Sequence, residues 1–284
     1  MRKVDIHQHI NSRGDIRPDE INAFIANASQ SLGAGSIIGI VDFHGLVAER
    51  KCEQSFEIMK KNHDAEVFCD SAAYLPRQDL WVLRGLESET SAGHILSVGL
   101  KLGTYIESSR DLPLVDALAQ ACIRRASTIL DHFLGFEGAG PYVDKHRGCL
   151  EEGLVGAIET HNRLAFGIPT KTTLFPNRAA KKWYAKNVRH DPSIRVGEIY
   201  GADGHNPQSV GTVYTLLPLN IMPDNPSFPE YFDNVLRANK MARGKTSTSL
   251  PAFVQHGFAV IGGYEGMKNG LSRLILGKRS GKKI

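Results

Sequence analysis

The sequence is poor in the features that mark secreted, disulfide-bonded or membrane-spanning proteins. Its 284 residues include four cysteines, which are widely spaced and form no Cys-x-x-Cys pair, so neither a disulfide framework nor a zinc ribbon is indicated. No apolar segment follows Met1-Arg2-Lys3, and no run approaches the roughly 18 apolar residues of a membrane span. We therefore expect reduced thiols, no membrane partner and a cytoplasmic location.

A strong excess of one charge is also lacking. The formal net charge is +4, which does not by itself indicate a nucleic-acid partner. Basic residues do cluster in 278–283 and again between residues 171 and 189. Such clusters are usually solvated faces, so they leave nucleic acid open as a partner, and the sequence does not fix the oligomeric state.

Apolar, strand-like runs alternate with amphipathic segments through most of the chain. Hydrophobic residues make up 42% of it, enough for a sizeable core. Strands are predicted at 4–9, 36–46, 65–75, 81–89, 94–102, 153–162 and 195–205, and helices at 18–33, 50–64, 114–134 and 177–187. This order favours an α/β fold with a parallel sheet or barrel wrapped by helices. After Leu217 the sequence becomes proline-rich and then helical, which predicts a barrel over 1–217 and an extension over 218–284 packed on it.

Potential metal ligands follow these apolar runs. Because the carboxyl ends of barrel strands meet at one face, where such enzymes keep their active sites, residues far apart in the chain are expected to converge there. The candidates are His7, His9, His44, Glu87, His132, His161, Asp203 and His205.

Two pairs of these candidates are spaced by two residues, His7 with His9 and Asp203 with His205. Residues two apart on a strand point to the same side. Imidazoles mixed with carboxylates suit zinc, manganese or iron, and the number of donors exceeds the need of one ion. The pattern therefore predicts two or three divalent ions, and the chemistry such a cluster favours is phosphoester hydrolysis by a metal-activated hydroxide.

The order of the motifs resembles that of the PHP (polymerase and histidinol phosphatase) family. The similar segments are DIHQHINSRGD at 5–15, IIGIVDFHG at 37–45, LRGLESETSAGHILSVGL at 83–100, ILDHF at 129–133, GAIETHN at 156–162 and YGADGHNPQSVGTVYTLL at 200–217. The resemblance covers about the first 217 residues. It implies a distorted (β/α)7 TIM-like barrel with a trinuclear metal site.

The resemblance also implies how the ligands are shared among three metal ions. The first ion would be held by His7, His9, Glu87 and Asp203, the second by Glu87, His132 and His161, and the third by Asp15, His44 and His205. Glu87 would bridge the first two ions and is preferred over Glu89.

Several assignments keep an alternative. The family's Thr-Asp-His appears here as Val41-Asp42-Phe43-His44, so either Asp42 or His44 is the ligand. His146 competes with His132, and Glu159 competes with His161. His94 is expected to orient a ligand or to pack locally instead of binding metal. For the substrate phosphate, cationic candidates on loops are Arg13, Arg147 and Lys171.

The function predicted from these residues is metal-dependent phosphoester hydrolysis, with the phosphomonoester of a small molecule or a nucleotide as substrate. One alternative is a nuclease or phosphodiesterase acting on nucleic-acid ends, which would bind in a strongly salt-dependent way. Another is a non-catalytic, metal-binding PHP module. An amidohydrolase is disfavoured because no metal-bridging lysine is evident in the middle of the chain.

Overall fold

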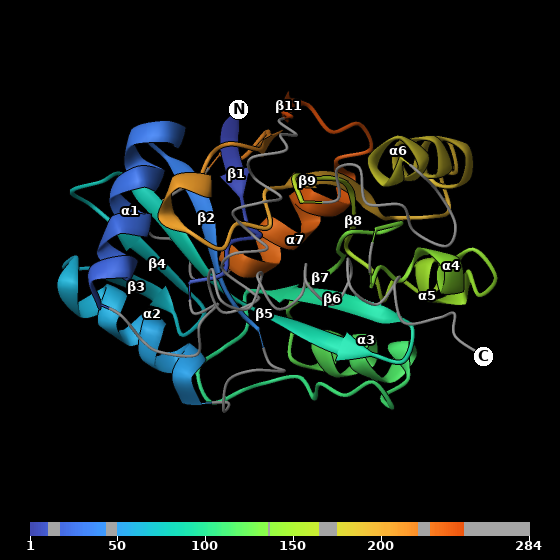
Figure 1. Cartoon of the computed structure of the whole chain (residues 1–284), viewed down its shortest axis with the longest axis horizontal. Coiled ribbons are helices and arrows are strands. Elements are labelled where there is room, and N and C mark those ends of the chain that lie inside the picture. The colour runs from blue at the N-terminus through green and yellow to red at the C-terminus, as the bar shows by residue number, and fades with distance from the viewer. Residues whose placement is uncertain (11–17, 44–49, 136, 165–174, 221–227, 247–284) are drawn as a thin grey trace, which may run out of the picture.

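The computed structural model describes residues 1–10, 18–43, 50–135, 137–164, 175–220 and 228–246. One twisted sheet carries helices on its outer side (Figure 1). Its strands are β1 (Arg2–Asp5), β2 (Ser36–Phe43), β3 (Glu66–Cys69), β4 (Ala72–Leu75), β5 (Leu80–Thr90), β6 (Gly93–Val98), β7 (Ser127–Leu130), β8 (Ala157–Asn162), β9 (Gly197–Gly201), β10 (Tyr214–Leu217) and β11 (Gly244–Lys245).

The sheet curls into a nearly closed barrel. Its main path runs β11-β10-β1-β2-β5-β6-β7-β8-β9. The segments that follow β9 and β1 meet, because the His9 amide donates to the Gly204 carbonyl (2.7 Å) and the Gly204 amide donates to the His7 carbonyl (3.2 Å). The last strand of the path, β9, therefore approaches β1 beside the first pair of histidines.

Strands β1, β2, β5, β7, β8 and β9 point the same way, whereas β6 runs against its neighbours β5 and β7. The reversal follows from the connection: Thr90 pairs with Gly93, and a two-residue turn can join only antiparallel strands. As a result β6 begins at the face where the parallel strands end, and it brings His94 to that face.

The barrel interior is apolar below this face and is closed from the other end by α7 (Phe228–Ala238). Phe228, Phe232 and Leu236 of α7 are buried in one cluster with inward-facing residues such as Trp81 and Leu96. Figure 1 shows α7 lying across the middle of the molecule. The packed apolar residues therefore fill the barrel on the side of the polar residues that faces away from the strand ends.

The remaining helices cover the outside. In Figure 1, α1 and α2 lie together on one flank and α4, α5 and α6 on the opposite one. The pattern of α1 follows the sequence prediction, since its buried residues recur on one face at Ile21, Phe24, Ile25 and Ala28. The bounds are α1 (Pro18–Leu32), α2 (Arg50–Asn62), α3 (Leu114–Ile123), α4 (Gly140–Val143), α5 (Gly148–Glu151), α6 (Pro176–Asn187) and a 3-10 turn at Pro207–Ser209.

Two predicted elements are corrected by the structure. The strand expected over 65–75 is the antiparallel hairpin β3–β4. The helix expected over 114–134 stops at Ile123, because Arg125 adopts a positive φ of 56°, and Ser127–Leu130 then forms β7 inside the sheet. The apolar residues after Arg125 fit a buried strand and a buried helix equally well, so their periodicity did not separate the two.

The structure thus confirms the mixed α/β class and a barrel-like sheet, while the seven-fold (β/α) repeat and the division at residue 217 stay predictions. Among the helices of the described ranges, none combines the length and the apolar character that crossing a membrane requires.

We expect Phe232→Ala to lower the free energy of unfolding by about 3–5 kcal/mol, because it leaves a cavity where α7 fills the barrel. Denaturant titration measures this loss. Ile123→Ala is the matched control, since Ile123 is 80% exposed and should change stability by no more than about 0.5 kcal/mol. Equal, small losses in both variants would contradict the packing of α7 described above.

Candidate metal centre

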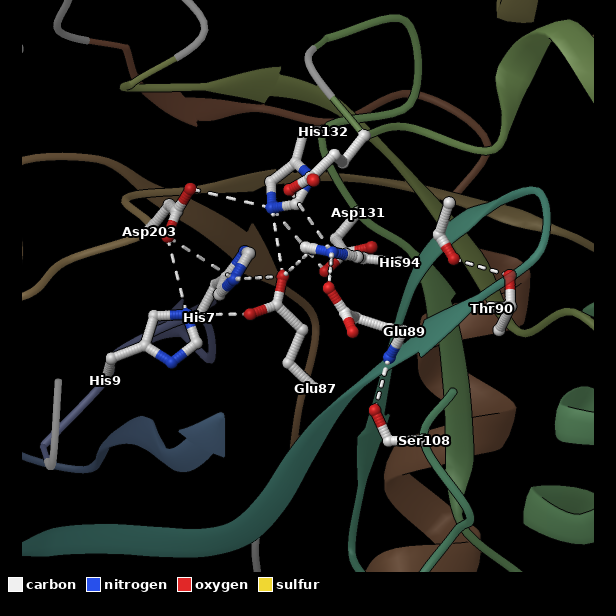
Figure 2. A network of polar contacts seen from close by, with 12 residues as sticks. His7, His9, Glu87, Glu89, Thr90, His94, Ser108, Asp131, His132 and Asp203 are labelled. Carbon is white, nitrogen blue, oxygen red and sulfur yellow. Dashed lines mark hydrogen bonds and ion pairs between the residues drawn. The ribbon is translucent and has the colours of Figure 1, made fainter. Parts of the chain in front are cut away.

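Glu87 lies at the centre of a cluster of buried histidines and carboxylates. It shares the inward face of β5 with Trp81 and Leu83, two of the apolar residues that line the barrel. Its carboxylate is 3% exposed. Figure 2 shows histidine side chains and the Asp203 carboxylate turned toward it.

The oxygens of Glu87 are approached by three imidazoles. Oε1 lies 3.1 Å from His132 Nε2 and 2.9 Å from His94 Nδ1, and Oε2 lies 3.3 Å from His9 Nε2. The Asp203 carboxylate faces the same group, with Oδ1 3.4 Å from His9 Nε2 and Oδ2 3.6 Å from His132 Nε2. Side chains on or next to five strands, β1, β5, β6, β7 and β9, therefore lie close enough together to share metal ions.

His7 and His9 reach this point because the first strand contains an extra residue. Val4 and Asp5 pair with Ile37 and Ile38, whereas His9 pairs with Val41. One residue more is thus accommodated between Asp5 and His9 than on β2, which is the definition of a β-bulge. The bulge changes which side chains point inward, so both imidazoles continue the inward face begun by Val4.

His132 and Asp203 both have positive φ angles, 32° and 48°. Such angles are uncommon outside glycine; each costs about 1–3 kcal/mol and persists only where the surroundings enforce it. Strand alternation would point the His132 imidazole outward, like the side chain of Leu130, and the turn at His132 directs it inward instead. Of the six non-glycine residues with positive φ in the described part of the chain, these two carry side chains that lie at the centre of the cluster.

Asp131 is a member that the sequence reasoning did not select. It follows inward-facing Ile129 by two residues on β7, and it is fully buried. Among the described residues, neither of its carboxylate oxygens accepts a hydrogen bond. His7, Glu87, Asp131 and His132 each offer a ligand atom within 4.8 Å of the others, and His7, His9 and Asp203 form a second such group.

His161 is not brought into either group. A register shift in β8 between Glu159 and His161 pairs His161 with Tyr200, and the two rings meet edge to face at 5.7 Å. Glu159, the alternative named from the sequence, points inward instead, with Oε1 3.0 Å from His7 Nδ1. Asp131 rather than His161 therefore stands beside His132.

His205 lies at the edge of the cluster. Its ring centroid is 4.6 Å from that of His9, and its Nδ1 is 3.0 Å from the Asp203 carbonyl oxygen. The other predicted ligands of the third ion, Asp15 and His44, lie outside the described residues, as do Arg13 and Lys171. The choice between His44 and Asp42 therefore stays open.

Arg147 is placed away from the cluster. Its guanidinium donates to the Asn187 carbonyl at the end of α6 (2.6 Å). That helix runs back to the start of β9, so its last residue lies near the opposite end of the barrel from the strand ends. We therefore do not retain Arg147 as a phosphate contact.

A third group of donors lies at the rim, formed by Glu89, His94 and Glu137. His94 Nε2 is 3.4 Å from Glu137 Oε2. The exposed guanidinium of Arg110 lies 3.3 Å from Glu89 and 3.4 Å from Glu137, so it already supplies positive charge to these carboxylates. Arg110 is a cation beside the cluster that the sequence did not single out.

The electrostatics of the cluster reflect burial and dense charge. Burial disfavours the imidazolium of His7, but the carboxylates of Glu159 and Asp203 outweigh it and raise the pKa of His7 to about 10. Burial would raise the pKa of Glu87, yet hydrogen bonds from His132 and His94 hold it well below its usual range. Burial raises the pKa of Asp131 to about 8.

These residues fit divalent cations. His7 Nε2 and both oxygens of Asp131 are buried and take part in no hydrogen bond with the described residues, although buried polar atoms are nearly always satisfied. Oxygen and imidazole donors without thiolates match zinc, manganese or iron. The residues present therefore could hold metal ions.

We expect zinc affinity to rise with pH. Without metal, His7 is protonated at neutral pH because its pKa is raised, and a metal must displace that proton. For each proton that zinc displaces, the zinc affinity should rise about tenfold per unit increase in pH. Chelator competition at pH 6, 7 and 8 measures the slope, and a flat profile would contradict binding at His7.

Comparisons with known proteins bear on the fold. No protein-family model matches the chain, and no curated protein matches it. Among solved structures it is similar to the crystal structure of PsfC from Pseudomonas syringae PB-5123, with a TM-score of 0.52 at 12% sequence identity, over 94% of this chain and 98% of PsfC. At that identity the similarity concerns the fold alone.

Proposed function

We propose that this protein is a metal-dependent phosphoesterase of the PHP type, acting on the phosphomonoester of a small molecule or nucleotide from a distorted (β/α)7 barrel. One observation carries the proposal: Glu87 lies within 3.3 Å of imidazole nitrogens from both His9 and His132. A buried carboxylate shared in this way suits a bridge between two divalent ions.

The charge of the cluster supports a role for metal ions. Glu87, Asp131, Glu159 and Asp203 place four carboxyl groups in a buried site. Divalent cations bound among these carboxyl groups would supply the positive charge that a phosphate dianion needs in such a site. We propose that His7, His9, Glu87 and Asp203 hold one ion and that Glu87, Asp131 and His132 hold a second.

Bound metal ions would lower the pKa of a water molecule and polarise the phosphoryl oxygens. The chain's own residues would hold the metal ions and orient the ligands. His94 donates toward Glu87 Oε1 from 2.9 Å, which fixes that carboxylate between its neighbours. The apolar barrel below, filled by Trp81, Leu96 and Phe232, keeps water from the underside of the site, where it would weaken these interactions.

We expect the manganese- or zinc-loaded protein to hydrolyse a generic aryl phosphate, and His9→Ala or Asp203→Ala to lower kcat by at least about 10²- to 10³-fold, as removal of a group that stabilises developing charge does. A spectrophotometric assay measures the released phenol. His190→Ala is the matched control, because His190 is exposed on the surface and should leave the rate unchanged.

A bis-aryl phosphodiester and short single-stranded oligonucleotides complete the test. Monoester cleavage that a chelator abolishes supports the proposal. Cleavage of the oligonucleotides alone would favour the alternative function, a nuclease or phosphodiesterase that acts on nucleic-acid ends. No hydrolysis of any of the three by fully metal-loaded protein would contradict the phosphoesterase and leave the non-catalytic module.

A further inference from the structure

Glu159 is a buried carboxylate that contacts the cluster without belonging to any of the three groups of metal donors. It is 1% exposed. Oε1 lies 3.0 Å from His7 Nδ1, and Oε2 accepts hydrogen bonds from the His132 amide (2.8 Å) and from Asn162 Nδ2 (2.9 Å). Both oxygens are thus directed at residues that enter the metal centre.

The contact with His7 decides which nitrogen of that imidazole faces the cluster. A carboxylate 3.0 Å from Nδ1 requires the proton to sit on Nδ1. Nε2 then points toward Asp203 and Glu87, whose oxygens are 3.7 and 4.0 Å away. Metal-ligating histidines almost always donate their other N–H to such a group, which fixes the tautomer and increases ligand basicity.

The other oxygen acts on the backbone. His132 has a positive φ of 32°, and its amide donates to Glu159 Oε2. This hydrogen bond helps to hold the strained turn that redirects the His132 imidazole toward Glu87. Without it, this partly buried amide would lose its acceptor.

Asn162 extends the same arrangement to β9. Its Nδ2 lies 2.9 Å from Glu159 Oε2 and 3.2 Å from Asp203 Oδ2. Asp203 is the second residue of the cluster with a positive φ. Through Asn162, the Glu159 carboxylate is linked to the carboxylate that faces His9.

The space for this carboxylate exists because residue 201 is glycine. A Cβ at Gly201 would overlap Glu159 Oε1 and lie 3.2 Å from the Cβ of His7. Gly201 stands between inward-facing Ile199 and Asp203 on the same strand face. The inward face of β9 therefore leaves a gap at the level of Glu159, between the core and the cluster.

From this geometry we infer that Glu159 is a positioning residue, which fixes the metal-binding tautomer of His7 and, with Asn162, the strained backbone at the cluster. The inference rests on the proposed metal centre. It assigns to β8 the task of orienting ligands carried by three other strands, rather than of supplying a ligand through His161.

The test measures zinc affinity by chelator competition for Glu159→Gln and Glu159→Leu. We expect Glu159→Leu to weaken binding by about 10- to 100-fold, as loss of a residue that orients a ligand does. Glu159→Gln should recover part of this, because its amide oxygen still accepts from His7 Nδ1. Long-range ¹H–¹⁵N correlation on zinc-loaded protein should show His7 with a protonated Nδ1, and weakened or mixed signals in Glu159→Leu.

Glu198→Gln is the matched control. Glu198 is a carboxylate of equal burial on β9, but it pairs with Thr160 and Arg189 instead of the cluster. Glu198→Gln should change zinc affinity by no more than about threefold if the effect at Glu159 is one of positioning. Gly201→Ala, which displaces the Glu159 carboxylate and changes no ligand, should weaken zinc binding in the same direction as Glu159→Gln.

The outcomes separate the inference from the function on which it rests. If the wild-type protein binds no zinc, the metal centre and the inference are both overturned. If it binds zinc and Glu159→Gln and Gly201→Ala bind equally tightly, with unchanged His7 signals, the inference alone is overturned. Should Glu159→Leu fail to fold, these two milder variants still decide the matter.

Discussion

The Glu87 carboxylate is the interaction on which the site depends. It is buried at the polar end of the barrel, and imidazoles from three other strands approach its two oxygens within 3.3 Å. A buried carboxylate without such partners would be protonated, since burial disfavours its charge. The histidines keep it ionised, and it holds them near one another in turn, so the convergence of β1, β5, β6 and β7 is both a packing result and an electrostatic one.

The sequence predicted the convergence well because strand ends are readable from apolar runs. Glu87 follows Leu83 and Asp203 follows Ile199 by even steps, as inward-facing residues should. Asp131 and Glu159 obey the same rule, two residues after Ile129 and Ala157, so strict alternation could have found them. Asp131 was not selected because the family resemblance pointed to the neighbouring His132, and Glu159 was kept only as the alternative to His161.

Local breaks in the strand pattern explain which side-chain directions could not be predicted from the sequence. The bulge before His9, the register shift before His161 and the positive φ angles at His132 and Asp203 each change which way a side chain points. The bulge and the register shift are set by pairing with other strands, so no local sequence pattern contains them. Such departures concentrate at functional sites, where geometry takes precedence over regularity.

The central claim is that divalent ions bind around Glu87. Anomalous diffraction from crystals grown with manganese or zinc tests it most directly. The account predicts strong anomalous peaks on both sides of the Glu87 carboxylate, one bounded by His7, His9 and Asp203 and one by Asp131 and His132. Peaks only elsewhere in the molecule, or none beside Glu87 in fully loaded crystals, would contradict it.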